Sequence, residues 1–315
     1  MSLEESSPGR GRSALVHGGL FLLTCATTFV AGAQLTGSFD PASGAAFAGT
    51  LMAILFCHEM GHYVVARRHR VDVSLPYFIP LPPFISLGTM GAVIRMRRPI
   101  SDRNQLIDVG AAGPLAGLVV AIPLLLLGLW LSPVAINPSP DAVVEGNSLA
   151  YIALKYLVHG RYLPGADGAD VQLHPVAFAA WVGLLITMIN LIPVGQLDGG
   201  HIASGYLADR HERFSAWLHR LLLLVGAGAL AALTLEARSA GWSWGDSLTR
   251  ATWAAMPWLV WAILLALLRR MSGGVYHPPV DGGAPTRGRR VLVAAMVVVF
   301  LLLFTPVPLR QVIPP

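Results

Sequence analysis

Long apolar stretches, separated by short polar or glycine- and proline-rich connections, dominate the chain. A helix needs about 20 mainly apolar residues to span a bilayer. Six stretches meet this condition, and a seventh near the C-terminus is also long enough: 13–35, 45–66, 106–131, 176–197, 214–236, 252–268 and 291–309. This pattern predicts an all-α polytopic membrane protein with six to seven transmembrane helices.

The stretch 75–98 is apolar but differs from the others. Four prolines between Pro76 and Pro83, followed by Gly88 and Gly91, exclude a straight helix. Non-helical backbone at membrane depth is tolerated only where it is buried in protein or lines a wet cavity. We therefore predict a re-entrant, β-hairpin-like segment, with the hairpin around Gly88–Met96. The alternative is an ordinary proline-rich surface loop.

Composition supports a membrane protein. The chain is 54% hydrophobic and 12% charged, whereas soluble domains contain about 25% charged residues. The net charge of +5 could suggest a nucleic-acid partner, but the basic residues lie between apolar stretches, where they control membrane topology. We expect contact with the lipid bilayer and none with nucleic acid. Cys25 and Cys57, the two cysteines, lie in apolar stretches and do not indicate a disulfide.

The distribution of basic residues predicts the orientation. If all seven stretches span and the N-terminus is cytoplasmic, 17 of the 22 Lys and Arg residues lie on the cytoplasmic side. The five on the other side are Lys155, Arg161, Arg238, Arg250 and Arg310. The longest outer connection, 132–174, is too irregular to predict a further domain. Residues 271–290 are interpreted as a flexible basic linker.

An ionisable residue inside a transmembrane stretch indicates function, because its burial in lipid is costly. Glu59 is such a residue and belongs to a His58-Glu59-x-x-His62 motif. Residues four apart share one helix face, so His58 and His62 can present two imidazoles to one zinc ion, with Glu59 beside bound water. The alternative is a pair of structural histidines.

A catalytic zinc needs a third protein ligand. No Asp, Glu or His occurs from Val73 to Ser101, and Val65 and Arg68 occupy the positions where metzincins need Gly and His. Asp198, at the end of the apolar stretch 176–197, lies at a similar predicted depth to the first motif, within about 10 Å. Pro193 and Gly199–Gly200 would let the backbone unwind there. The alternative role for Asp198 is an interfacial cap.

Four segments together resemble the site-2 protease family of intramembrane zinc metalloproteases, in its chloroplast and bacterial branch. They are HEMGH, GTMGAVIRM, AAGPLAG at 111–117 and NLIPVGQLDGGH from Asn190. The resemblance covers residues 45–205. It implies Zn²⁺ as cofactor, with His58, His62 and Asp198 as ligands and Glu59 as general base.

Further residues receive roles or alternatives. The resemblance implies that Asn190 holds the substrate carbonyl or the oxyanion; hydrogen bonding between helices is the alternative. The hairpin could capture an unwound substrate as an added strand, with substrate-binding residues Gly88, Gly91, Ala92, Val93 and Ile94. The remaining polar residues near these motifs are interpreted as structural or interfacial: Asp102, Asp108, His174 and His201.

The sequence thus predicts a metalloprotease that cleaves within or near transmembrane segments. The resemblance implies a single-span membrane protein as substrate, such as an anti-sigma factor or another membrane-bound regulator. We expect a bacterial inner membrane and an active site that faces the cytoplasm. Two alternatives remain: a transporter or channel with a metal site, which the lack of matching halves disfavours, and a non-catalytic relative, which Glu59 disfavours. The expected parts are an N-terminal tail and first span (1–44), a catalytic core (45–205) and C-terminal helices (206–315).

Overall fold

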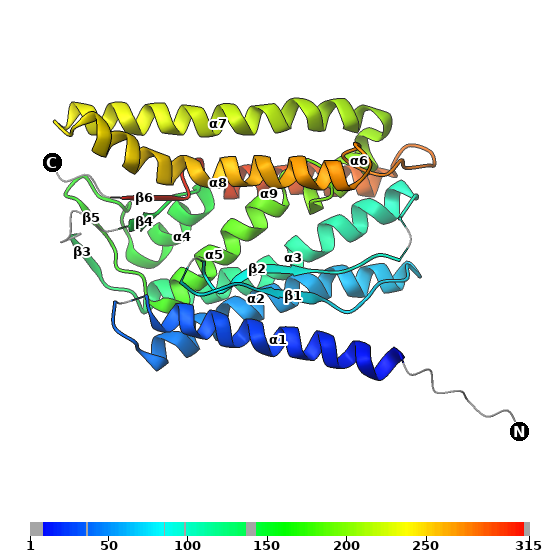
Figure 1. Ribbon diagram of the computed structural model, residues 1–315, viewed down its shortest axis with the longest axis horizontal. Coiled ribbons are helices and arrows are strands. Elements are labelled where there is room, and N and C mark those ends of the chain that lie inside the picture. Colours follow the sequence, from blue (N-terminus) through cyan, green and yellow to red (C-terminus); the bar gives the residue numbers. More distant parts are fainter. Residues whose placement is uncertain (1–8, 36, 85, 98, 137–142, 312–315) are drawn as a thin grey trace, which may run out of the picture.

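The computed structural model describes residues 9–35, 37–84, 86–97, 99–136 and 143–311 (Figure 1). Its helices are α1 (Gly9–Ala33), α2 (Pro41–Arg68), α3 (Arg103–Trp130), α4 (Leu149–His159), α5 (Pro175–Asn190), α6 (Asp198–Leu207), α7 (His211–Ser239), α8 (Trp244–Met271) and α9 (Arg287–Leu303). The strands are β1 (Tyr77–Pro80), β2 (Thr89–Val93), β3 (Val134–Ile136), β4 (Val143–Glu145), β5 (Ala169–Val171) and β6 (Leu309–Gln311). Helices α1 and α7 lie at opposite edges, with α2, α3 and α5 between them (Figure 1).

Five segments of the described chain are helical, long and apolar enough to cross a membrane: 14–33, 41–68, 103–130, 198–239 and 254–271. This finding supports a mostly helical, polytopic membrane protein, and six to seven spans stay a prediction. Helix α5 has 16 residues instead of the predicted 22, because the helix ends at Asn190 before Pro193. Helix α9 ends at Leu303 instead of residue 309, since Pro306 and Pro308 follow.

A β-hairpin forms in the proline-rich segment, and it is larger than predicted. Strand β1 pairs antiparallel with β2, with Tyr77 opposite Val93 and Pro80 opposite Thr89. The segment Gly88–Met96 therefore supplies only the second strand and not a whole hairpin. Its first strand comes from the residues between the prolines, because Pro76 and Pro80 are compatible with extended backbone. Whether the hairpin enters the membrane stays a prediction.

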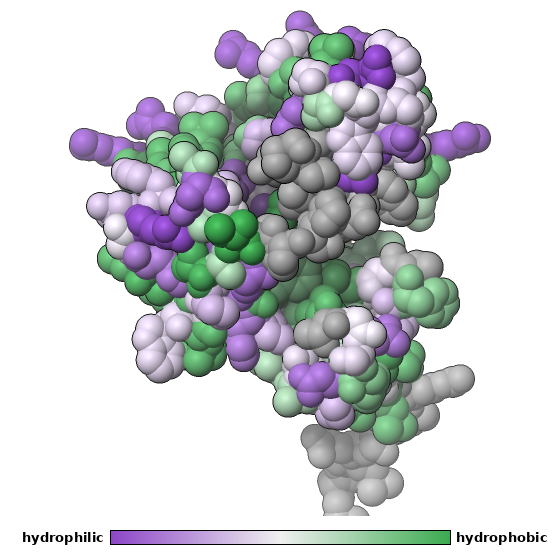
Figure 2. Space-filling model, turned by 90° about the vertical axis from the view of Figure 1, so that its left-hand side faces the viewer, coloured by the Kyte–Doolittle hydropathy of each residue, from purple (hydrophilic) through white to green (hydrophobic). Residues whose placement is uncertain are grey.

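The connection 132–174 contains more structure than the sequence indicated. Strand β3 pairs with β5, and helix α4 lies between them along the chain. Strand β4 pairs with β6, so this connection is joined to the segment after α9. Each of these strands has three residues, which is too short for a recognisable alternating pattern. Seen from the end that carries β3 and β5, the surface mixes hydrophilic and hydrophobic residues, and hydrophobic residues lie deep inside a hollow in it (Figure 2).

Lys155 in α4, the single lysine, is fully buried at this end. Its ammonium donates a hydrogen bond to Asp170 at 3.0 Å and lies 4.0 Å from Glu145. The hydroxyl of Tyr151 donates to Glu145 at 2.9 Å. Burial raises the pKa of Glu145 above its usual value. Because the ammonium is buried and paired, Lys155 joins β4, α4 and β5 instead of acting as a free outer charge.

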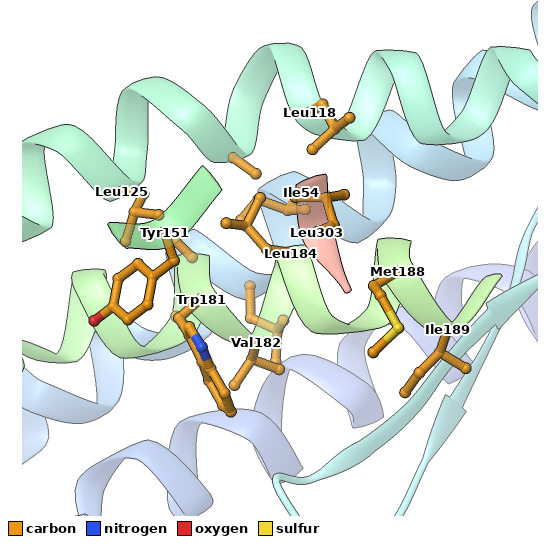
Figure 3. Packing of buried hydrophobic residues seen from close by; sticks show 14 of the residues in the cluster. Ile54, Leu118, Leu125, Tyr151, Trp181, Val182, Leu184, Met188, Ile189 and Leu303 are labelled. Carbon is orange, nitrogen blue, oxygen red and sulfur yellow. The ribbon is translucent and has the colours of Figure 1, made fainter. Parts of the chain in front are cut away.

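The main apolar core lies between α2, α3 and α5 (Figure 3). Ile54, Leu118 and Leu184 meet in it, and Trp181 and Tyr151 extend it toward β4. Small residues let the helices approach closely: a side chain at Gly128 of α3 would begin 2.3 Å from the backbone of Ala177 in α5. Close packing of small residues is the usual basis of helix association in membranes.

The expected flexible linker 271–290 is not a linker throughout, because Arg287–Arg290 begin α9 and the residues before them form hydrogen bonds near the start of α3. The amide of Asp281 donates to the carbonyl of Ser101, and Thr286 donates to the side chain of Asn104. We call residues 272–286 the strap. The strap joins α8 to the start of α3 through hydrogen bonds that its backbone amides donate, which composition alone does not reveal. Helix α9 then packs against α3, α4, α5 and α6, and the expected division into three parts stays a prediction.

Candidate metal centre

His58, His62 and Asp198 converge although 140 positions separate the first from the last. The Asp198 carboxylate lies 3.1 Å from Nε2 of His58 through one oxygen and 3.1 Å from Nε2 of His62 through the other. The two Nε2 atoms are 3.2 Å apart. One ligand atom from each residue lies within 4.8 Å of the others, and both histidines are buried.

The two histidines are brought to the site by α2, a helix with a well-defined start. Asp40 caps it by accepting hydrogen bonds from the amides of Ala42 and Ser43, and Pro41 occupies its first turn. Helical spacing then places His58 and His62 one turn apart, with ring centroids separated by 4.9 Å. The helix therefore presents both imidazoles on one face, as the motif predicted.

Helix α3 makes room for these imidazoles with glycine. A Cβ atom at Gly113 would lie 2.0 Å from Nε2 of His62, and one at Gly117 would lie 3.3 Å from His58. In the other direction, a Cβ at Gly61 of α2 would lie 2.5 Å from the carbonyl oxygen of Ala112. The sequence interpretation used AAGPLAG only as a mark of resemblance and missed this role of Gly113. The recurrence of small residues in a span was the signal that could have revealed it.

A backbone carbonyl orients His62. Its Nδ1 lies 2.7 Å from the carbonyl oxygen of Val109 in α3. Because that oxygen can only accept, Nδ1 carries the proton and donates, which leaves the lone pair of Nε2 directed at the cluster. Metal-binding histidines usually have such a partner on the other ring nitrogen.

Asp198 reaches the cluster because the chain leaves its helix before this residue. Helix α5 ends at Asn190, a non-helical turn follows, and Asp198 begins α6. Glycine is required where α6 begins, since a Cβ at Gly199 would lie 2.1 Å from the carbonyl oxygen of Leu191, and one at Gly200 would lie 2.2 Å from that of Gly195. The two glycines thus form the first turn of a new helix, and the expectation that they unwind an existing one was wrong.

Glu59 lies next to the cluster, whereas the role of Asn190 depends on the resemblance alone. Glu59 is buried on α2 beside His58, and its carboxylate interacts electrostatically with His62 and Asp198. Asn190 is the last residue of α5 and is half-buried. Its predicted role, which is to hold the substrate carbonyl or the oxyanion, stays a prediction.

The other polar candidates lie at helix ends or in ion pairs. His174 caps α5 and Asp102 caps α3, each by accepting a hydrogen bond from a backbone amide. Asp108 accepts two hydrogen bonds from Arg289 and lies 3.0 Å from Nε2 of His69. These contacts connect α3 to α2 and α9.

His201 follows Asp198 by one helical turn and contacts the strap. Its Nδ1 lies 2.8 Å from Nε2 of His277, whose Nδ1 lies 2.7 Å from the carbonyl oxygen of Pro278. The ring of His211 meets His277 edge to face, with centroids 5.8 Å apart. Burial lowers the pKa of His277 below its usual value. Sequence reasoning missed His277, which lies in a segment of no recognisable pattern.

Of the five predicted substrate-binding residues, Gly88 has a different contact from the expected one. Its backbone packs on α1: a Cβ there would lie 2.5 Å from the backbone of Thr27, and the Thr27 hydroxyl donates to the Gly88 carbonyl at 2.6 Å. Gly91 has a φ of +97° and open space at its Cβ position. Ala92 and Ile94 are half-buried, and Val93 is 52% exposed. The close backbone contact of Gly88 is therefore with α1, and substrate binding by these five residues stays a prediction.

Comparison with known proteins gives the family. The model of peptidase family M50 matches residues 46–233, which include all three members of the cluster and Glu59. The chain belongs to peptidase family M50. This result confirms the resemblance to site-2 proteases.

Curated relatives agree with this assignment. The chain is 35% identical over 160 residues to the probable chloroplastic zinc metalloprotease EGY1 of Arabidopsis thaliana, which is 49% of this chain and 28% of the relative. It is 35% identical over 185 residues to EGY2 of the same plant, covering 58% and 31%. It is 34% identical over 186 residues to EGY2 of Oryza sativa subsp. indica, covering 59% and 31%. No solved structure matches the chain.

The relatives differ from this chain in length, and their location differs from the predicted one. The chain spans less than a third of the length of each of these three. All three are chloroplastic proteins of plants, which conflicts with the expectation of a bacterial inner membrane. The apolar helices still support an integral membrane protein.

Proposed function

We propose that this chain is an intramembrane zinc metalloprotease that hydrolyses peptide bonds within or near transmembrane segments of other membrane proteins. The observation that carries the proposal is the buried convergence of His58, His62 and Asp198 in helices long and apolar enough to span a membrane. The names of its relatives, which describe probable zinc metalloproteases, support it.

The residues present fit a zinc ion. Two imidazole nitrogens and one carboxylate oxygen are the donor types of catalytic zinc sites, where three protein ligands leave one position open. The orientation of His62 by the Val109 carbonyl fits a ligand role as well. Zinc at such a site acidifies water and polarises a carbonyl group.

Glu59 is the residue that would move the proton. Its carboxylate precedes the second histidine by three residues on the same helix and is buried near the cluster. We assign it the general-base role, in which it takes a proton from the attacking water and returns it to the leaving amine nitrogen. Asn190 is proposed to hold the substrate carbonyl or the oxyanion.

The substrate class follows from burial. A site enclosed by spanning helices is reached by segments that are themselves in the membrane, so we propose a single-span membrane protein as substrate, such as an anti-sigma factor or a membrane-bound regulator. A spanning helix hides its amides in its own hydrogen bonds and must unwind before hydrolysis. Strand β1 covers one edge of β2, and no strand of the described chain covers the other. We propose that this edge binds the unwound substrate as an added strand.

The decisive experiment is co-expression with candidate single-span proteins, followed by mass spectrometry of the products. Glu59→Gln should reduce cleavage by about 100-fold to 10,000-fold, because glutamine accepts no proton. The variant should retain its metal, since Glu59 is not among the ligands. Cleavage at the wild-type rate would exclude Glu59 as the base. Metal retention without cleavage of any membrane protein would favour the transporter or channel alternative.

A second experiment tests the proposed substrate-binding edge. Ala92→Pro and Ile94→Pro each remove a backbone N–H from β2 or its continuation. Residues two apart in a strand direct these groups to the same edge, so both variants should reduce cleavage strongly if this edge binds the substrate. Val93→Ala changes only a side chain and serves as the control, with little expected effect. Metal content should stay normal in all three. If both proline variants cleave as well as wild type, β2 is not the substrate-binding edge.

The orientation can be tested separately. The charge distribution supports a cytoplasmic N-terminus and an active site that opens toward the arginine-rich side. Arg68, at the end of α2, and Gly168, before β5, are both exposed and lie at opposite ends of the proposed spans. In a variant without Cys25 and Cys57, an impermeant thiol reagent should label Arg68→Cys only from the inside and Gly168→Cys from the outside. The opposite labelling would invert the orientation.

A further inference from the structure

A cavity of about 470 Å³ lies behind the metal-bearing helix α6. It is enclosed by α6, α7, α9 and the turn after α5, and its walls are almost entirely apolar. Ile202, Ala203 and Tyr206 form its α6 wall, and α7 residues face them, among them Phe214, Leu218 and Leu222. Gly110 of α3 packs on Asp198 and His201 from another side of α6. The cavity is therefore distinct from the metal centre.

The cavity opens to the outer surface between α6 and α9. Three of its lining residues are also exposed: Tyr206 is 44% exposed, Val297 is 52% and Leu301 is 57%. An apolar cavity of this kind takes up apolar ligands in preference to water. The segment 198–239, which supplies the α6 and α7 walls, is long and apolar enough to span a membrane, so we expect lipid hydrocarbon at this opening.

Two arginines lie at one end of the cavity. Arg210 precedes Phe214 by four residues, and Arg290 precedes Val293 by three, so each arginine shares a helix face with a lining residue, one turn beyond it. Both are exposed, and in the described part of the chain neither forms an ion pair. Arg269 and Arg289, by contrast, pair with Glu212 and Asp108. An apolar cavity with two unpaired cations at its rim matches a ligand with a hydrocarbon chain and an anionic head.

We propose that this cavity binds one acyl chain of an anionic phospholipid, whose phosphate lies against Arg210 and Arg290. The volume of the cavity favours an acyl chain over a substrate helix. A helix 10–12 Å in diameter fills roughly 400–600 Å³ with each turn of 5.4 Å, so the cavity holds about one turn and no spanning segment. An acyl chain fits within it and restores packing contacts that its lining residues lack.

The site would connect lipid binding to the metal centre. Leu191, Ile192 and Pro193 line the cavity and belong to the turn that carries the chain from α5 to Asp198. An acyl chain packed on them would hold this turn and α6 in place. The bound lipid is therefore expected to stabilise the segment that supplies one metal ligand, without touching the metal.

Native mass spectrometry of the full chain in detergent can test the proposal, with dioleoyl phosphatidylglycerol as the anionic probe and dioleoyl phosphatidylcholine as the zwitterionic one. Wild type should bind one molecule of the anionic lipid more tightly than the zwitterionic lipid. A basic residue near an anionic surface contributes about 1 kcal/mol, which is about 5-fold in affinity. Arg210→Gln and Arg290→Gln should each weaken the anionic complex by about that factor. Arg270→Gln is the control, because Arg270 lies in the last turn of α8, away from the cavity. This variant should change the affinity for the anionic lipid by less than about 2-fold.

A second set of variants tests the cavity itself. Ala203→Phe and Val297→Trp should fill it and abolish specific binding, and Val297→Trp is the safer of the two for folding because Val297 is half exposed. Ala231→Phe, at an exposed position of α7, is the matched control and should bind as wild type does. Equal affinity for both lipids, or unchanged binding in Val297→Trp, would overturn the proposal. Metal content is the folding control and should stay close to that of wild type in Val297→Trp, because Val297 lies on α9 and not on the helix that supplies Asp198.

Discussion

The helices around the metal centre and the α7–α8 pair are built differently. In α2, 56% of the most apolar 18 residues are buried, against 28% in residues 254–271 of α8. Glycines of α2 and α3 allow backbone and imidazole to approach within van der Waals distance, whereas Gly228 of α7 has nothing within 4 Å of its Cβ position. A site that holds three ligand atoms within 4.8 Å needs fixed neighbours. The α7–α8 pair supplies no metal ligand and has no such constraint. The large apolar cavity lies on the side of α6 that faces α7.

The largest expected effect comes from adding one methyl group on each side of this comparison. Gly113→Ala places a Cβ where Nε2 of His62 lies, so either α3 or the imidazole must move. Overpacking of this kind costs about 1–3 kcal/mol, and the displaced ligand should reduce metal content sharply. Gly228→Ala meets open space and should leave metal content unchanged, with thermal stability equal to or slightly above that of wild type, because alanine favours the helix more than glycine does. The measurements are the metal content and the thermal unfolding of the two variants. Equal results for Gly113→Ala and Gly228→Ala would contradict the role of α3 in making room for His62.

A smaller effect is expected in the hairpin. Both Gly88 and Gly91 have positive φ, so alanine strains each by a similar amount. Only at Gly88 would the methyl group also collide with the backbone of Thr27 in α1. Gly88→Ala should therefore expose β1 and β2 to faster hydrogen exchange, and Gly91→Ala should do so less. Faster exchange in Gly91→Ala than in Gly88→Ala would show that α1 does not hold the hairpin.

The sequence predicted the parts of the molecule whose signal is local. His58 and His62 share a helix face because of their spacing, and the apolar stretches mark the long helices, with ends that differ by up to eight residues. Asp198 could be proposed because a carboxylate after a span is rare. The turn between Asn190 and Asp198 was only partly predictable, since glycines fit both an unwound segment and a tight helix start. The pairing of β4 with β6 and the strap contacts depend on residues far apart in sequence, which no local pattern records.

The smallest expected effect concerns the strap. Burial lowers the pKa of His277, so the folded state, in which the strap is attached, disfavours protonation of this residue. As pH falls below the ordinary histidine value of 6.5, the unfolded state binds the proton and the folded state does not, which removes stability. The facing groups His201, His211 and Ser204 are the same in His277→Gln. The advantage of wild type over His277→Gln in thermal stability should therefore shrink between pH 7.5 and pH 5.5. An advantage that grows over this range would contradict the assigned direction.

The most direct test of the central claim is the zinc content of the purified chain and of Asp198→Ala. The account predicts about one zinc ion per chain in wild type, because three protein ligands suffice for a catalytic site. Asp198→Ala should lose most of it, as should His58→Ala, while Asp102→Ala, which removes a helix cap away from the cluster, should retain it. Full zinc content in Asp198→Ala would show that α6 does not supply the third ligand and would contradict the proposed site.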